Sequence, residues 1–127
     1  MRDSRTVPTL NALHPQEFEQ LVDYLLVRQG NVVVSKHSQD TGVDFVANAP
    51  DGSYVGVDVL TRIRRDRIDS LLLRLQRGRA HFDRLLIVTL ADLSMKDLDY
   101  LRSESISVID RSRLIEMLSL YGVVVES

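Results

Sequence analysis

Hydrophobic residues recur at helical spacing in three segments of the chain. Residues 15–29 carry the first stripe, residues 66–77 the second, and a segment after Asp110 the third. Apolar residues at intervals of three and four share one face of a helix, so each segment predicts an amphipathic helix. Pro15 suits a first helical position and Gly30 a left-handed stop, which supports the limits of the first helix.

Capping residues mark two helix starts. Ser94 has Asp97 in the capping-box place, and Leu93 and Leu98 flank them as a hydrophobic staple. Asp110 is a good N-cap for the last helix, which Gly122 ends.

Short β-branched or apolar runs predict five strands. They cover residues 32–34, 43–47, 54–61, 85–90 and 106–109. The sequence Ala49-Pro50-Asp51-Gly52 is typical of a tight turn, because proline and glycine favour the backbone angles that turns require. We therefore expect the second and third strands to form an antiparallel hairpin. In the third strand one face carries Val55, Val57 and Val59, and the other carries Tyr54, Gly56, Asp58, Leu60 and Arg62.

The predicted order is α-β-β-β-α-β-α-β-α. Strands separated by helices pair in parallel through right-handed crossovers, whereas the hairpin is antiparallel. We therefore predict one α/β domain over residues 13–127, with a mixed β-sheet flanked by helices. Residues 1–12 are expected to form a polar N-terminal arm.

Composition narrows the class of protein. The chain has 127 residues, 44% of them hydrophobic and 27% charged, and no cysteine. This fits a single globular domain without disulfides or thiolate metal sites. No apolar run approaches the roughly 20 residues of a membrane span, so we expect a soluble, cytoplasmic protein with no membrane partner.

The charge distribution leaves a nucleic-acid partner open. The net charge is −2, which argues against general attraction to a phosphate backbone. Basic residues nevertheless cluster between Arg62 and Arg84. A local basic face is therefore possible.

Asp44 and Asp58 lie on the two strands of the predicted hairpin. One interpretation is a metal site, since two carboxylates on adjacent strands suit magnesium. The other is that both are polar residues on a solvent-facing side of an antiparallel pair. The residues alone favour the second interpretation.

Three motifs add a family resemblance. They are His14-Pro15-Gln16-Glu17-Phe18-Glu19, Asp40-Thr41-Gly42-Val43-Asp44-Phe45 and Val57-Asp58-Val59-Leu60. Together with the order of elements, they resemble the Mrr-type restriction endonuclease domain of the PD-D/E-x-K nuclease fold, from about Leu13 to Gly122.

The resemblance implies a catalytic site. Asp44 and Asp58 match the aspartate and third-strand acid that hold magnesium, for which manganese is a substitute, and Glu19 matches the glutamate of the first helix. The family's lysine falls on Leu60, which has neither charge nor hydrogen-bond donor. Arg62, one pleat farther along the strand, and Lys36, at the end of the first strand, are the candidates to compensate.

Three functional hypotheses follow. The first is a nuclease-derived, nucleic-acid-associated protein that is weak or inactive as a nuclease, because the lysine is missing. The second is an active magnesium-dependent DNA endonuclease in which Arg62 or Lys36 compensates. The third is a scaffold or protein-interaction module without catalysis.

The expected partner is DNA, with methylated DNA one candidate. Its backbone would contact basic residues near the hairpin, namely Lys36, Arg62, Arg64, Arg65 and Arg67. A homodimer or a partner chain is expected as well, since cutting both strands generally calls for two active sites.

Overall fold

A five-stranded mixed sheet forms the centre of the protein. The computed structural model describes residues 5–7, 10–36 and 42–125. The sheet consists of β2 (Val32–Lys36), β3 (Phe45–Asn48), β4 (Tyr54–Leu60), β5 (Arg84–Thr89) and β6 (Ile106–Ile109), in that spatial order. Strands β2, β3 and β4 are antiparallel, and β4, β5 and β6 are parallel. The predicted mixed sheet is confirmed.

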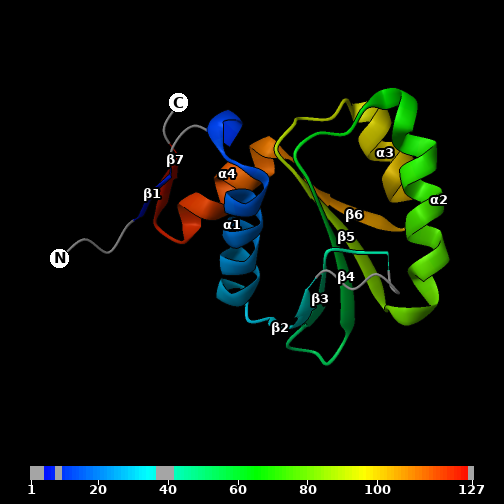
Figure 1. Ribbon diagram of the computed structural model, residues 1–127, viewed down its shortest axis with the longest axis horizontal. Coiled ribbons are helices and arrows are strands. Elements are labelled where there is room, and N and C mark those ends of the chain that lie inside the picture. The colour runs from blue at the N-terminus through cyan, green and yellow to red at the C-terminus, as the bar shows by residue number, and fades with distance from the viewer. Residues whose placement is uncertain (1–4, 8–9, 37–41, 126–127) are drawn as a thin grey trace.

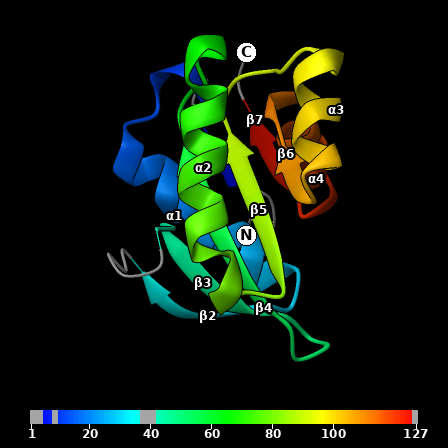
Figure 2. The same cartoon turned by 90° about the vertical axis from the view of Figure 1, so that its right-hand side faces the viewer.

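Helices cover both faces of this sheet. Those of the described part are α1 (Pro15–Arg28), α2 (Ile68–Gly78), α3 (Met95–Ser103) and α4 (Arg111–Leu120). Short 3-10 turns are η1 (Leu10–Ala12), η2 (Arg65–Arg67) and η3 (Arg79–His81). Helices α1 and α4 lie on one side of the sheet and α2 and α3 on the other (Figure 1). Seen from the latter side, α2 runs across the front of the sheet (Figure 2).

The N-caps predicted at Ser94 and Asp110 are confirmed, whereas the helix predicted from residue 66 begins at Ile68, after the 3-10 turn η2. The Ser94 side chain accepts a hydrogen bond from Asp97 N at 3.1 Å, and the Asp110 side chain accepts one from Arg113 N at 3.2 Å. Each bond satisfies an N–H group that the first turn of a helix leaves without a partner. Gly30 has φ +90°, so the left-handed stop predicted after α1 is also confirmed.

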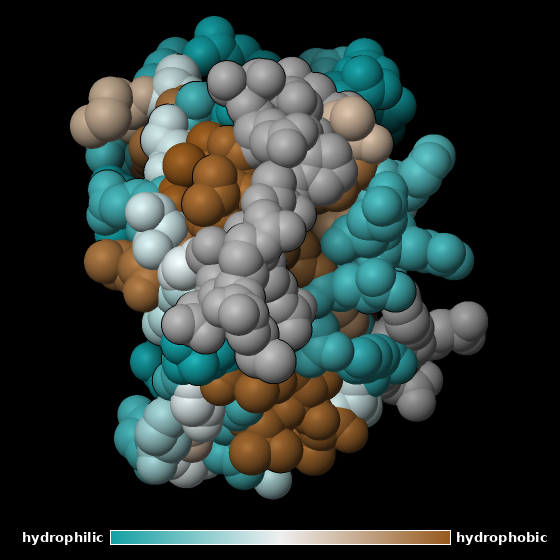
Figure 3. All heavy atoms as spheres, turned by 90° about the vertical axis from the view of Figure 1, so that its left-hand side faces the viewer, coloured by the Kyte–Doolittle hydropathy of each residue, from teal (hydrophilic) through white to brown (hydrophobic). Residues whose placement is uncertain are grey.

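Two short strands at the ends of the chain were not predicted. β1 (Arg5–Val7) pairs in parallel with β7 (Val123–Val125), apart from the main sheet. This pair lies beside α4 and α1, on the side of the molecule that Figure 3 shows. A strand of three residues is too short to show the alternation of apolar and polar residues by which strands are predicted, which explains why β1 and β7 were not predicted.

Two hydrophobic clusters fill the space on either side of the sheet. The first lies under α1 and α4 and includes Phe18, Phe45 and Val57. Leu10, inside the predicted N-terminal arm, is fully buried in this cluster. The second lies under α2 and α3 and includes Leu75 and Ile87. Alternate residues of β4 and β5 point into the two clusters, so both strands are covered on both faces.

Candidate active site

The hairpin brings Asp44 and Asp58 to the same face of the sheet. Phe45 pairs with Val57 across the two strands and both face the α1 side, so Asp58 faces the α2 side. Asp44 lies just before β3, and its carboxylate is close enough to Asp58 to raise the pKa of Asp58. The Asp44 N–H donates to the Val57 carbonyl at 3.0 Å. In addition, Asp44 Oδ2 accepts a hydrogen bond from Val59 N at 2.7 Å. These two bonds fix Asp44 against the middle of β4.

Asp58 is buried, with only 2% of its surface exposed. The solvent-facing alternative is therefore wrong for this residue, because helix α2 covers that face of the sheet. Asp44 is half-buried. A carboxylate in such a place needs charged or hydrogen-bonding partners to offset its lost hydration.

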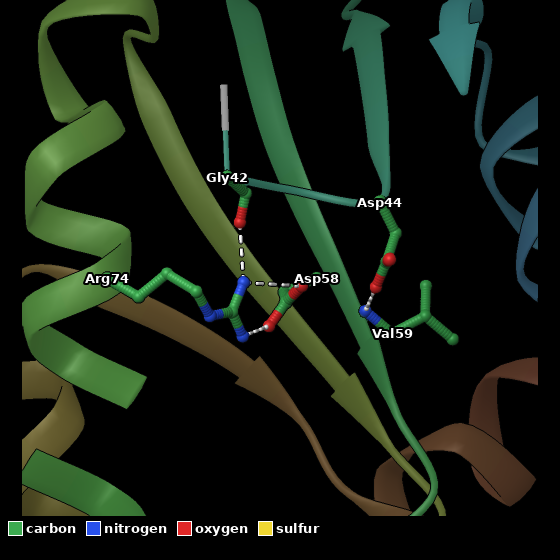
Figure 4. A network of polar contacts seen from close by, with 5 residues as sticks. All are labelled: Gly42, Asp44, Asp58, Val59 and Arg74. Atoms are coloured by element: carbon green, nitrogen blue, oxygen red, sulfur yellow. Dashed lines mark hydrogen bonds and ion pairs between the residues drawn. The ribbon is translucent and has the colours of Figure 1, made fainter. Parts of the chain in front are cut away.

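Arg74 of α2 supplies those partners. Its Nη2 lies 2.6 Å from Asp58 Oδ2, and its Nη1 lies 3.4 Å from Asp58 Oδ1. The same Nη1 donates to the Gly42 carbonyl at 2.5 Å. Figure 4 shows the guanidinium reaching from α2 towards the hairpin, with the Asp58 carboxylate beside it and the Gly42 carbonyl above it. Both carboxylate oxygens of Asp58 are thus paired with one cation.

Sequence reasoning missed Arg74. Its position carried a signal, since it lies three residues after Leu71 and one before Leu75, on the edge of the apolar stripe of α2. An arginine next to a buried stripe calls for a polar partner inside the protein. The sequence did not show which carboxylate would supply it.

Burial and charge act in opposite directions on Asp58. Burial raises its pKa from 3.8 to about 6, even though hydrogen bonds and charge attraction from Arg74 lower it. The nearby Asp44 carboxylate also raises the pKa. The pKa of Arg74 is raised, chiefly by its hydrogen bonds to Asp58, so the guanidinium remains charged.

A groove adjoins this ion pair. It has a volume of about 410 Å³ and lies between the end of β4 and α2. Arg62, Arg64, Arg67 and Arg74 contribute to its lining, together with Leu60. The groove therefore concentrates positive charge beside the two hairpin aspartates.

The basic residues of the segment after β4 point to different places. Arg64 pairs with Asp66 at 3.2 Å. Arg65 instead reaches the start of α3, where it donates to Ser94 Oγ at 3.2 Å and lies 3.6 Å from an Asp97 oxygen. The side chains of Arg62 and Arg67 form no ion pair with any other residue that the structure describes.

Comparison with protein families shows which family the chain belongs to. The family model described as Restriction endonuclease, the Mrr catalytic domain, matches residues 10–118. The chain belongs to this Mrr restriction endonuclease family. No curated protein and no solved structure matches the chain.

The candidate site residues of this Mrr-family chain fall on both faces of the sheet. Asp44, Asp58 and Leu60 lie on the α2 face, and Leu60 contacts the cluster beneath that helix. Asp40 and Thr41, which precede this set in the second motif, lie outside the described residues.

Lys36 and Glu19 lie on the α1 face instead. Lys36 pairs with Phe45 across β2 and β3, its ammonium group is 2.7 Å from Asp23 Oδ2, and it lies over the Phe45 ring. Glu19 lines a small hollow together with Lys36. The sheet therefore separates Lys36 from Asp58, whereas Arg62 shares the groove with Arg74.

The family implies magnesium, and the arrangement of these residues does not fit a bound metal. Both oxygens of Asp58 are engaged by Arg74, and one oxygen of Asp44 accepts a backbone hydrogen bond. Throughout the described segments, no group of three or more histidine, cysteine, aspartate or glutamate side chains is placed to hold a metal ion. The positive charge that a metal would bring to this Mrr-family site is supplied by Arg74.

Proposed function

We propose that this chain is a nuclease-derived, nucleic-acid-binding protein with weak or no hydrolytic activity. The observation that carries the proposal is the two-point contact of Arg74 with Asp58, the carboxylate that matches a metal ligand of the family. A cation built into the protein competes directly with magnesium for that carboxylate.

The missing lysine supports the same conclusion. In nucleases of this kind a lysine positions the attacking water and offsets charge that grows on the phosphate. Leu60 supplies neither a charge nor a donor, and it is half-buried. Removing one preorganised donor costs roughly 10² to 10³ in rate if oxyanion-hole magnitudes transfer. Arg62 lines the same groove as Arg74 and can bind a phosphate there, but an arginine stays protonated and is a poor base.

Nucleic-acid binding is supported by the arginine groove. Arg62 and Arg67 are exposed and lack ion-pair partners among the described residues, so the groove has positive charge to offer a phosphate. Arginine pairs with phosphate oxygens through two parallel hydrogen bonds. This local charge outweighs the net charge of −2, because screening limits distant charges to about 10 Å.

A plasmid assay tests the proposal. Methylated and unmethylated supercoiled plasmids are incubated with manganese and the wild-type protein or the Asp44→Ala/Asp58→Ala variant, and DNA binding is measured by gel shift. We expect binding without nicking. Nicking by the wild type alone would instead establish an active endonuclease. A folded protein with neither activity would favour a scaffold.

The cellular setting is a further part of the proposal. We propose a cytoplasmic protein, because the chain has no cysteine and none of the described helices is long and apolar enough to cross a membrane. A homodimer or a partner chain is proposed as well, because the chain is derived from nucleases, in which cutting both DNA strands generally calls for two active sites. Sedimentation with and without DNA measures the oligomeric state.

A further inference from the structure

The groove beside Arg74 has an apolar floor as well as a basic rim. Leu60, Ile63 and Leu71 form the floor, and Ser70 of α2 lies at its side. Leu71 is buried, while Leu60 and Ile63 are partly exposed. The position where the family has a lysine thus contributes a hydrocarbon surface. A phosphate group alone would make no favourable contact with these apolar side chains.

The rim has the opposite character. Arg62, Arg64 and Arg67 are all exposed, and only Arg64 is paired with an acid among the described residues. Arg74 is held by Asp58 on one side, yet 44% of its side chain remains exposed on the other. Because Arg62 and Arg67 have no acidic partner within the described part of the chain, the groove is complementary to an anion.

We propose that this groove binds an unpaired nucleotide of a nucleic-acid strand, with the base on the apolar floor and the phosphate on Arg62 and Arg67. The inference rests on the proposed nucleic-acid binding and names the class of ligand. A volume of about 410 Å³ lies within the range of roughly 300 to 1,000 Å³ that is typical of small-molecule sites.

The chemistry of an unpaired nucleotide matches both surfaces. Unpaired bases pack against apolar side chains and stack on guanidinium planes, while the adjoining phosphate takes arginine hydrogen bonds. A base-paired duplex presents mainly phosphates on its outer surface. Its backbone would meet the arginine rim and leave the floor of Leu60, Ile63 and Leu71 uncovered. The groove therefore discriminates single strands from duplexes.

Fluorescence anisotropy measures the discrimination. A labelled 12-nucleotide oligothymidine and a 12-base-pair duplex are titrated with wild-type protein, without metal, at several salt concentrations. We expect the single strand to bind at least about tenfold more tightly. In the Arg62→Gln/Arg67→Gln variant its affinity falls, and the salt slope falls by about 1.4 for two lost phosphate contacts. Arg77→Gln/Arg102→Gln, with equal charge loss on exposed residues outside the groove lining, serves as the control.

A second variant tests the floor. Ser70 is exposed on α2, so Ser70→Tyr fills the groove without disturbing the sheet, and thermal unfolding verifies that the variant is folded. We expect Ser70→Tyr to lose the preference for single strands. In NMR titrations, thymidine 5′-monophosphate shifts the methyl signals of Leu60, Ile63 and Leu71, whereas inorganic phosphate leaves them in place.

The outcomes separate this inference from the proposed function. Equal affinity for both DNA forms, with unshifted methyl signals, would overturn the nucleotide site and leave nucleic-acid binding intact. Binding that is lost equally in the Arg77→Gln/Arg102→Gln control would also overturn it, because the groove would not be the binding site. A folded wild-type protein that binds neither DNA form would refute both proposals.

Discussion

The guanidinium of Arg74 on α2 holds both carboxylate oxygens of Asp58 on β4, with its Nη2 2.6 Å from Asp58 Oδ2. This contact joins the helix after the hairpin to the strand that carries the proposed metal-ligand position. It explains how a buried carboxylate is accommodated in the fold. It also identifies Arg74 as the residue to replace in order to test whether the two aspartates can bind a divalent metal ion.

Replacing Arg74 is expected to open the aspartate pair to divalent cations. Arg74→Gln leaves Asp58 without its cation, which destabilises the fold by about 1–3 kcal/mol at pH 8. Manganese then has two adjacent carboxylates to bind. Calorimetric titration and thermal unfolding measure the effect, with Arg77→Gln on the same helix as the matched control. If manganese stabilises the wild type and the Arg74→Gln variant by equal amounts, this account is contradicted.

Restoring the family's lysine alone is expected to change little. Leu60→Lys returns the missing cation but leaves Arg74 bound to Asp58. We therefore expect no gain in plasmid nicking from Leu60→Lys, and a measurable gain from Leu60→Lys/Arg74→Gln in manganese. The triple variant that adds Asp58→Ala is the control. If the single change already produces nicking, Arg74 is not an obstacle to metal binding.

Asp58 is expected to make the protein less stable as the pH rises from 4 to 7. Its pKa is about 6 in the folded protein against 3.8 for an aspartate in the unfolded chain, so the folded state keeps the proton to higher pH than the unfolded state. The stabilisation by this proton is complete below pH 4 and is lost as the pH rises through 6. A shift of this size corresponds to about 2–3 kcal/mol.

Urea unfolding of the wild type and Asp58→Asn at each pH isolates this contribution. Subtracting the two stability curves removes the titration of surface acids such as Asp51 and Asp92, whose pKa values are lowered by hydrogen bonds from Ser53 and Ser112, respectively. The wild type should lose stability relative to Asp58→Asn between pH 4 and 7. A difference that stays flat over this range would show that Asp58 is not protonated in the folded protein.

Gly56 is expected to resist even a methyl group. A Cβ atom at this position would lie 2.8 Å from Phe82 Cδ2 and 2.9 Å from Phe82 Cε2, although the glycine has no positive φ. Gly56→Ala should therefore cost about 1–3 kcal/mol through overpacking. Thermal unfolding of Gly56→Ala, Phe82→Ala and the double variant measures the coupling. Purely additive costs would mean that the Phe82 ring is not the obstacle.

The sequence by itself determined the elements of the fold. Hydrophobic period, capping residues and turn chemistry are local properties, so they predicted the helix starts at Ser94 and Asp110 and the hairpin that carries Asp44 and Asp58. The alternation along β4 also predicted that Asp58 and Leu60 share a face. Strands β1 and β7 were missed, because their pairing joins two short segments at opposite ends of the chain.

Only the tertiary structure decided what surrounds the aspartates. The sequence placed Lys36 near the site by its strand position, but strand register puts it on the α1 face, opposite Asp58. Arg74 is 16 residues from Asp58, and their contact depends on how α2 packs across the sheet. Side chains that are distant in sequence meet only when packing fixes the rotation and position of each element. Because that packing sums many weak contacts over the whole domain, no local pattern near Asp58 reveals that its partner is Arg74.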